Sequence, residues 1–276
     1  MYYNIRNDEK RKPFYSHINV ITTYAWFTMN KEVSVTGMKV QATASEGLVI
    51  SGDNKSTWQT DWDVAMPTGV KLYPTNTNGD PTKWAVAYSK RFDNADAEQS
   101  GTGYTDLTLA YTTASGTTFG SGEGIGQVTA SGSTQNYVLK KKFFIKSTGD
   151  NPLSADLIVK EVTATVDTRT GSGSANLNKA LRVLIVVGDE QFIYAPVTGY
   201  DSSIKYKGTG DNLTLIGSST ASTAEDVNTI GNLDSSAVQV DVYIYYEGED
   251  DNCKSSNITG INVDTLNVGI KFGYTE

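Results

Sequence analysis

The sequence predicts an all-β protein, a jelly-roll-like β-sandwich with long polar loop insertions. Apolar and polar residues alternate in many short segments, which is the pattern of half-buried strands. Segments rich in Gly, Ser, Thr and Asn separate these stretches, and none sustains the periodicity of a long helix. The number of long polar segments favours a jelly roll over a compact immunoglobulin fold.

Short strands and long polar segments alternate in the first half of the chain. Residues 33–50 predict two short strands, and residues 51–70 predict a polar loop. Another strand is expected at 84–88. Residues 93–135 predict a long excursion, the kind of region in which functional loops often lie.

The second half of the chain shows firmer alternation. Residues 181–187 are apolar on both faces and predict a central buried strand. Short helices are expected only at 176–180 and 220–228. The predicted strands are 137–147, 157–167, 181–187, 191–196, 238–247 and 266–272.

We expect residues 1–30 to form an N-terminal arm and residues 31–276 to form a single β-sandwich domain. In the arm, basic residues precede a mildly apolar stretch, an order that imitates a secretory signal peptide. The apolar stretch is short and contains polar residues. Three interpretations therefore stay open: a soluble arm, an altered remnant of an export signal, or a membrane-surface segment.

Residues 23–27 read Thr-Tyr-Ala-Trp-Phe, and related segments follow at 33–40 and 44–50. This box resembles that of exported surface proteins of Gram-positive gut bacteria, where it stands beside the cleavage point of the export signal. It is also similar to that of secreted filament-forming proteins of the TasA and camelysin type. The resemblance is strongest over 23–50 and 238–253, and it implies an exported jelly-roll subunit.

The composition excludes several classes of function. A single Cys and a single His cannot build a disulfide framework, a Cys-rich zinc site or a His-cluster metal site. A net charge of −8 argues against sequence-independent binding of nucleic acid. No apolar run is long enough to span a membrane. We therefore expect a non-enzymatic protein with no nucleic-acid partner, no membrane span and no cofactor beyond a structural Ca²⁺.

The Ca²⁺ prediction rests on an acidic turn after the strand 238–247. Its carboxylates offer the oxygen ligands that Ca²⁺ prefers, although the spacing is not that of an EF-hand. A solvated acidic turn is the alternative. Cys253 ends this turn and is expected to be structural, because the one His, His17, lies in the arm. The candidate metal ligands are Glu247, Glu249, Asp250 and Asp251.

Two other motifs are interpreted structurally. The spaced glycines of residues 120–126 resemble a nucleotide-binding fingerprint, but no helix follows them, so we expect a flexible loop. Lys140, Lys141 and Lys142 stand together in a predicted strand. Lysines discourage unwanted pairing at a sheet edge, so we expect an edge strand there. A site for an anionic ligand is the alternative.

Aromatic residues in the polar segments suggest a carbohydrate contact. A flat apolar ring suits the C–H face of a sugar, and Trp58, Trp62 and Trp84 are the candidate contacts. Core packing is the alternative for the same rings.

The leading functional hypothesis is an extracellular structural protein, a surface or filament (pilus-like) subunit that self-associates into a homopolymer. Residues 18–29 are β-prone and aromatic, and would be donated as a strand to the next subunit. A head-to-tail contact of this kind does not close and gives fibres. The alternatives are a carbohydrate-binding adhesin that contacts a glycan or host surface, and a virion or phage structural protein. The expected assembly residues are Ile18, Val20, Thr22, Tyr24, Trp26 and Phe27.

Overall fold

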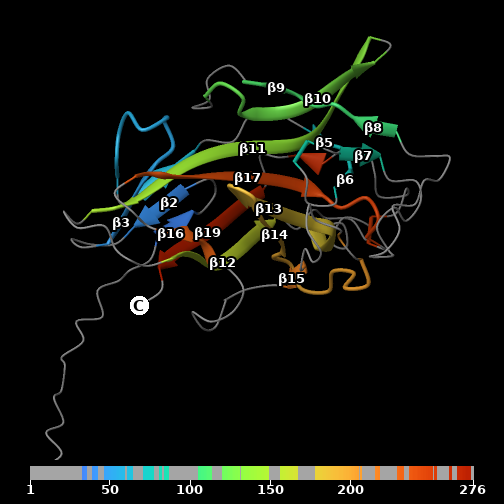
Figure 1. The fold of residues 1–276 in the computed structure, drawn as a ribbon. Coiled ribbons are helices and arrows are strands. Elements are labelled where there is room, and N and C mark those ends of the chain that lie inside the picture. The colour runs from blue at the N-terminus through green and yellow to red at the C-terminus, as the bar shows by residue number, and fades with distance from the viewer. Residues whose placement is uncertain are drawn as a thin grey trace, which may run out of the picture.

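The computed structural model confirms the all-β sandwich, built from two large sheets (Figure 1). All structural statements refer to the residues it describes. These are 33–35, 39–42, 47–59, 61–64, 71–77, 81–82, 84–86, 105–113, 120–130, 132–148, 156–166, 178–204, 206, 215–217, 229–232, 236–250, 252–253, 261–262 and 266–274.

The larger sheet is built around two long antiparallel strands, β11 and β17, which run side by side through the middle of the molecule (Figure 1). Its strand order is β15-β14-β13-β17-β11-β10-β9; the short strands β3 and β5 also pair with β11, and β18 pairs with β5. The bounds are β15 Leu215–Gly217, β14 Glu190–Ala195, β13 Leu181–Val187, β17 Val238–Tyr246, β11 Ser133–Ser147, β10 Gly124–Ala130, β9 Ala110–Thr112, β3 Leu48–Ser51, β5 Lys71–Leu72 and β18 Ile261–Asn262.

The second sheet packs against the inner face of the first. Its order is β16-β12-β19-β1-β2-β4, and β12 and β19 are its long members. The bounds are β16 Thr229–Asn232, β12 Asp156–Val166, β19 Leu266–Tyr274, β1 Val33–Val35, β2 Lys39–Ala42 and β4 Asp61–Asp63.

A third, small sheet and one 3-10 turn complete the described elements. The small sheet joins β6 (Asn76–Thr77), β7 (Trp84–Val86) and β8 (Thr105–Leu107). The 3-10 turn η1 (Asn178–Ala180) leads into β13. In the described part of the chain, no helix is long and apolar enough to cross a membrane.

Alternation along β17 shows how the sequence builds two cores at once. Val240, Val242 and Ile244 belong to the main core between the two large sheets. Tyr243 and Tyr245 point the other way, because successive side chains of a strand face opposite sides. They join a second buried cluster on the outer face, with Trp84 of the small sheet. The larger sheet is therefore covered on both faces over this region.

The strands expected in the second half of the chain are confirmed, with small shifts at their ends. The first half departs more from expectation. Residues 33–50 contain three strands rather than two, and Gly124 begins β10, so the expected loop at 120–126 is a turn followed by a strand. The expected short helix at 176–180 is the 3-10 turn. Residues 220–228 lie outside the described residues.

The expected edge strand is wrong, because β10 and β17 flank β11 at Lys140. In the part of the chain that the structure describes, Lys141 and Lys142 pair only with β17 and lie at a gap between β10 and β3. At this gap Lys141 forms a buried ion pair with Glu123, and Lys142 lines a pocket.

Candidate functional site

A break in strand pairing lies along one side of β11. β10 pairs with β11 up to Lys140, and β3 begins to pair at Phe144. Between them, among the described residues, no strand adjoins β11 on this side, while β17 continues on the other. Unpaired peptide groups at such a break need other partners.

The carboxylate of Glu123 fills the break. Its Oε1 accepts the backbone N–H of Lys142 at 3.1 Å. Its Oε2 accepts hydrogen bonds from Lys141 Nζ and from the backbone N–H of Gly120, both at 2.7 Å. Lys141 Nζ also donates to the carbonyl oxygen of Gly52 at 2.6 Å. The Glu123 and Lys141 side chains together thus connect β11, the turn before β10 and the loop after β3.

Lys141 is a charged residue on a core-facing position. It follows Leu139 and precedes Phe143 on the inner face of β11, and its side chain is fully buried. Burial lowers the pKa of Lys141, while the hydrogen bond and the charge of Glu123 oppose that shift. The ion pair satisfies both charges where water cannot. Sequence reasoning missed this pair, although a lysine among apolar residues at two-residue spacing was its signal.

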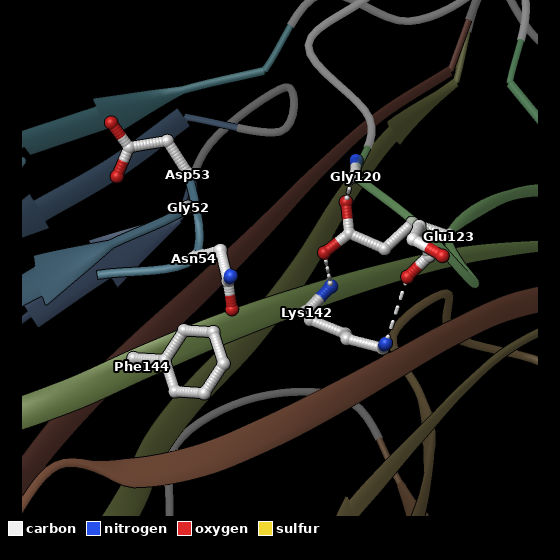
Figure 2. A pocket seen from close by; sticks show the side chains of 8 residues that line it. Gly52, Asp53, Asn54, Gly120, Glu123, Lys142 and Phe144 are labelled. Atoms are coloured by element: carbon white, nitrogen blue, oxygen red, sulfur yellow. Dashed lines mark hydrogen bonds between the residues drawn. The ribbon is translucent and has the colours of Figure 1, made fainter. Parts of the chain in front are cut away.

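An open pocket of about 600 Å³ lies over the break, between the loop after β3 and the turn before β10 (Figure 2). Phe144 and Lys142 of β11 line it, with Asn54 on one side and Ser121 on the other. Figure 2 shows the side chain of Asn54 pointing toward Phe144, whereas the carboxylate of Asp53 points away from the pocket.

The loop after β3 is held by its own hydrogen bonds. The Asp53 carboxylate accepts from Ser51 Oγ at 2.7 Å, from the Thr57 N–H at 2.9 Å and from Thr57 Oγ1. Slight desolvation raises the pKa of Asp53, but these hydrogen bonds outweigh it and lower the pKa. Asn54 and Lys55 adopt left-handed backbone conformations, with φ of 60° and 70°. The loop therefore has a fixed conformation beside the pocket, and its ionised Asp53 carboxylate is turned into the loop and away from the pocket.

Lysines and aromatic rings alternate beside the pocket. Lys142, Phe144 and Lys146 share one face of β11 because they are two residues apart. Lys55 Nζ lies 4.8 Å from the centroid of the Phe144 ring, and Lys146 Nζ lies 4.2 Å from that of Trp58. Both distances are those of cation–π contacts. We call these residues, Lys55, Trp58, Lys142, Phe144 and Lys146, the cationic–aromatic strip.

The three tryptophans predicted as glycan contacts lie in different surroundings. Trp84 is 1% exposed and Trp62 is 8% exposed, so these rings are core residues and present no face to a sugar. The prediction that Trp62 and Trp84 are exposed glycan contacts is wrong, and the alternative, core packing, is confirmed. Trp58 is partly exposed and lies in the strip beside the pocket.

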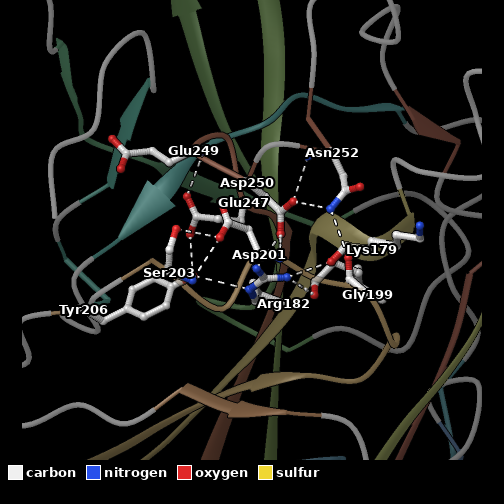
Figure 3. Close-up of polar contacts among 11 residues, drawn as sticks. Lys179, Arg182, Gly199, Asp201, Ser203, Tyr206, Glu247, Glu249, Asp250 and Asn252 are labelled. Carbon is white, nitrogen blue, oxygen red and sulfur yellow. Dashed lines mark hydrogen bonds and ion pairs between the residues drawn. The ribbon is translucent and has the colours of Figure 1, made fainter. Parts of the chain in front are cut away.

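A second polar cluster is buried on the outer side of β13 (Figure 3). Arg182 is fully buried and its Nη2 donates to Asp250 Oδ2 at 2.7 Å. Its Nε donates to the hydroxyl oxygen of Tyr206 at 3.3 Å, and that hydroxyl donates to Glu247 Oε2 at 2.8 Å. Arg182 Nη1 donates to the carbonyl oxygens of Lys179 and Leu181. The cluster fastens the turn after β17 to β13.

Burial raises the pKa of two acidic groups at this turn, Glu247 and Cys253. Desolvation raises the pKa of Glu247 to about 8, although the nearby Arg182 opposes the shift. Burial likewise raises the pKa of the Cys253 thiol to about 12. A thiol with so high a pKa is protonated and a poor nucleophile at neutral pH, which agrees with a structural role.

Two of the four candidate Ca²⁺ ligands, Glu247 and Asp250, serve this cluster instead. Glu247 and Asp250 are at most 2% exposed and bind Tyr206 and Arg182. Both oxygens of Asp250 already accept hydrogen bonds, Oδ1 from Asn252 and Oδ2 from Arg182 and the Asp201 N–H. Among the described residues no group of three or more His, Cys, Asp or Glu is placed to hold a metal ion. Asp251 lies outside them. The solvated-turn alternative fails for Glu247 and Asp250, which are buried, whereas Glu249 and Asn252 are partly exposed.

One long strand of the second sheet has an open edge. β12 pairs with β19 along nearly its whole length, but β16 pairs only with its start, at Asp156 and Ile158. Within the described ranges, no strand lies beside residues Val159–Val166 on that side. Val159 and Val162 point into the main core and Thr163 is exposed. This edge is a ready template for another strand.

The expected donor-strand residues, from Ile18 to Phe27, lie outside the described residues, as does His17. No protein-family model, curated protein or solved structure matches this chain. The candidate sites therefore stand on the geometry alone: the pocket with its strip, the buried Arg182 cluster and the open edge of β12.

Proposed function

We propose that this protein is a non-enzymatic extracellular structural protein, a surface or filament subunit that assembles by strand donation. The observation that carries the proposal is the open edge of β12 over Val159–Val166. The occupant that we assign to it is the segment of residues 18–29 of a second copy. An added strand contributes main-chain hydrogen bonds, and its alternate side chains give specificity.

The open edge of β12 is long enough for an added strand, and β12 is paired with β19 on its other side. Eight residues of β12 extend past the end of β16, which is longer than the mean strand of about five to six residues. β19 supports them from the other side through pairing that runs to Val166. An incoming strand would therefore extend a sheet that is already ordered.

The donor segment is apolar and aromatic at alternating positions. Val20, Tyr24 and Trp26 share one face of an extended chain, and Ile18 and Thr22 complete that face. A subunit that donates its own N-terminal segment and accepts that of its neighbour makes a contact that does not close. Repetition of the contact gives a fibre.

The test is deletion of residues 1–30, with filaments counted by electron microscopy and mass measured by sedimentation. We expect the full chain to form filaments and the truncated chain to stay monomeric with its β-sheet circular dichroism intact. In the full chain, Thr22→Pro removes a backbone N–H from the donor and should also stop assembly, while Asn7→Pro, outside the donor, should not. Filaments from the truncated chain would contradict the proposal, as would their absence from the full chain.

A further inference from the structure

We infer that the pocket over β11, together with the cationic–aromatic strip, binds an anionic saccharide, that is, a sugar chain bearing carboxylate or sulfate groups. This inference does not depend on assembly, because the pocket lies on the larger sheet, whereas the open edge belongs to β12 of the other sheet.

The charge around the pocket is positive, in a protein whose net charge is −8. Lys142 lines the pocket, and Lys55 and Lys146 stand beside it over aromatic rings. The pocket's two carboxylates do not cancel these charges. Glu123 is balanced by the buried Lys141, and Asp53 leaves one negative charge against three lysines, on a carboxylate that points away from the pocket. An anion entering the pocket therefore meets ammonium groups first.

The lysines keep hydrogen-bonding capacity for a ligand. An ammonium group carries three N–H donors, and the contact of Lys142 Nζ with the carbonyl oxygen of Ser121, at 3.0 Å, uses one. Asn54 adds an amide that points toward the space over Phe144 (Figure 2). An amide donates and accepts at once, which matches a sugar hydroxyl.

The size and lining favour a saccharide over a small inorganic anion. A volume of about 600 Å³ is that of a small-molecule site, far larger than a single sulfate needs. Phe144 lies at the floor of the pocket, but it is 7% exposed and Lys55 Nζ lies over its ring, so the lysines and Asn54 are the groups that a sugar meets. Lys142 and Lys146 are on β11 and Lys55 is on the loop after β3, and Lys55 and Lys146 lie over different rings, so the positive charge is spread over more than the width of one small anion.

The strip extends the site along β11. Lys142 and Lys146 are four residues apart, so their Cα atoms are separated by roughly 13 Å. Trp58 stands at the far end, with Lys146 Nζ over its ring. Charges repeated at such a spacing, with rings between them, fit a chain of sugar units better than a single one.

The experiment measures binding of trigalacturonate to the full chain by isothermal titration calorimetry at low and at physiological salt. Its methyl ester has the same rings without charge and serves as the matched neutral ligand. A sulfated trisaccharide distinguishes a sulfate-bearing source from a carboxylate-bearing one. We expect binding of one charged trisaccharide, at least ten-fold weaker binding of the neutral ester, and weaker binding at higher salt.

Four variants assign the binding to the pocket. Lys142→Gln and Lys55→Gln remove charge, and Asn54→Gly removes the amide at a left-handed position that glycine adopts freely. Each should raise the Kd at least five-fold with an unchanged melting temperature. Lys271→Gln, on β19 of the other sheet, removes the same charge away from the pocket and should leave the Kd unchanged. Since Lys55 and Asn54 are exposed, the test stands even where Lys142→Gln fails to fold.

Several outcomes would overturn the inference. These are no binding of either charged trisaccharide, equal binding of the neutral ester, or an equal loss in Lys271→Gln. Equally tight binding of inorganic sulfate or of AMP would also overturn it, since the site would then recognise an anion or a nucleotide rather than a sugar chain. None of these results bears on filament formation, which is measured separately.

Discussion

Lys141 and Arg182 each place a positive charge on a buried strand whose neighbours are apolar. A buried charge without a partner costs several kcal/mol, so each must find a carboxylate. Glu123 meets Lys141 from 18 positions earlier in the chain, and Asp250 meets Arg182 from 68 positions later. The two pairs fasten loops to the large sheet at separate places along it.

Substitution of Glu123 by Gln should destabilise the protein by about 3–5 kcal/mol, because the buried ammonium of Lys141 loses its counter-charge. The free energy of unfolding in urea at pH 7 measures the effect. Glu161→Gln makes the same change to the more exposed pair of Lys271 and Glu161 and should cost less than about 1 kcal/mol. Equal losses in the two variants would mean that burial of the pair does not matter.

Removing both charges tests the same pair further. The double variant Glu123→Gln, Lys141→Met should recover part of the stability lost in Glu123→Gln, since no buried charge remains. A double-mutant cycle on unfolding free energies gives the coupling. Strictly additive losses would show that the two side chains do not interact.

At the level of elements, the hairpins around β10 depend on glycines in left-handed conformations. Gly124 has φ of 105°, and a Cβ there would lie 2.3 Å from the carbonyl oxygen of Thr112 on β9. Gly132, between β10 and β11, has φ of 78° and open space around it. A substitution at Gly132 therefore tests backbone strain alone, whereas a substitution at Gly124 tests strain and a steric clash together.

Gly124→Ala should therefore be much more damaging than Gly132→Ala. The Gly132 variant bears only the strain of a left-handed alanine, about 1–2 kcal/mol. The Gly124 variant adds a clash with backbone that cannot move without breaking the β9–β10 pairing. Thermal unfolding followed by circular dichroism compares the variants. Similar melting temperatures would refute the close packing of β9 on Gly124.

For the whole molecule, the buried Glu247 couples folding to pH. Its pKa of about 8 in the folded protein is above the ordinary value of 4.5 expected in the unfolded chain, so folding increases its proton affinity. The stability from this group is fully present below pH 4.5 and is lost as the pH rises through about 8. Asp53, whose pKa is lowered, has the opposite effect: its contribution to stability is lost only at low pH, as the pH falls through its lowered pKa.

Glu247→Gln should flatten this dependence between pH 5 and pH 9. The wild-type protein should lose stability over that range relative to the variant, on the order of a few kcal/mol. Urea midpoints at a series of pH values measure the difference. A constant difference between wild type and variant across the range would show that Glu247 does not titrate there.

The sequence by itself determined the all-β class and most strands of the second half, such as 181–187 and 238–246, because strand alternation is local and visible in adjacent residues. The same alternation placed Tyr243 and Tyr245 opposite to Val242 and Ile244. It did not reveal that both faces are buried, since the small sheet that carries Trp84 is brought there from far away in the chain.

Only the tertiary structure decided the sites. Pairing of β11 with β10 and β3 put Lys141 opposite Glu123 and opened the pocket over Phe144. Packing of the turn after β17 on β13 made two of the expected Ca²⁺ ligands, Asp250 and Glu247, partners of Arg182 and Tyr206. Ion pairs and pockets depend on which distant segments become neighbours, and strand periodicity does not encode that choice.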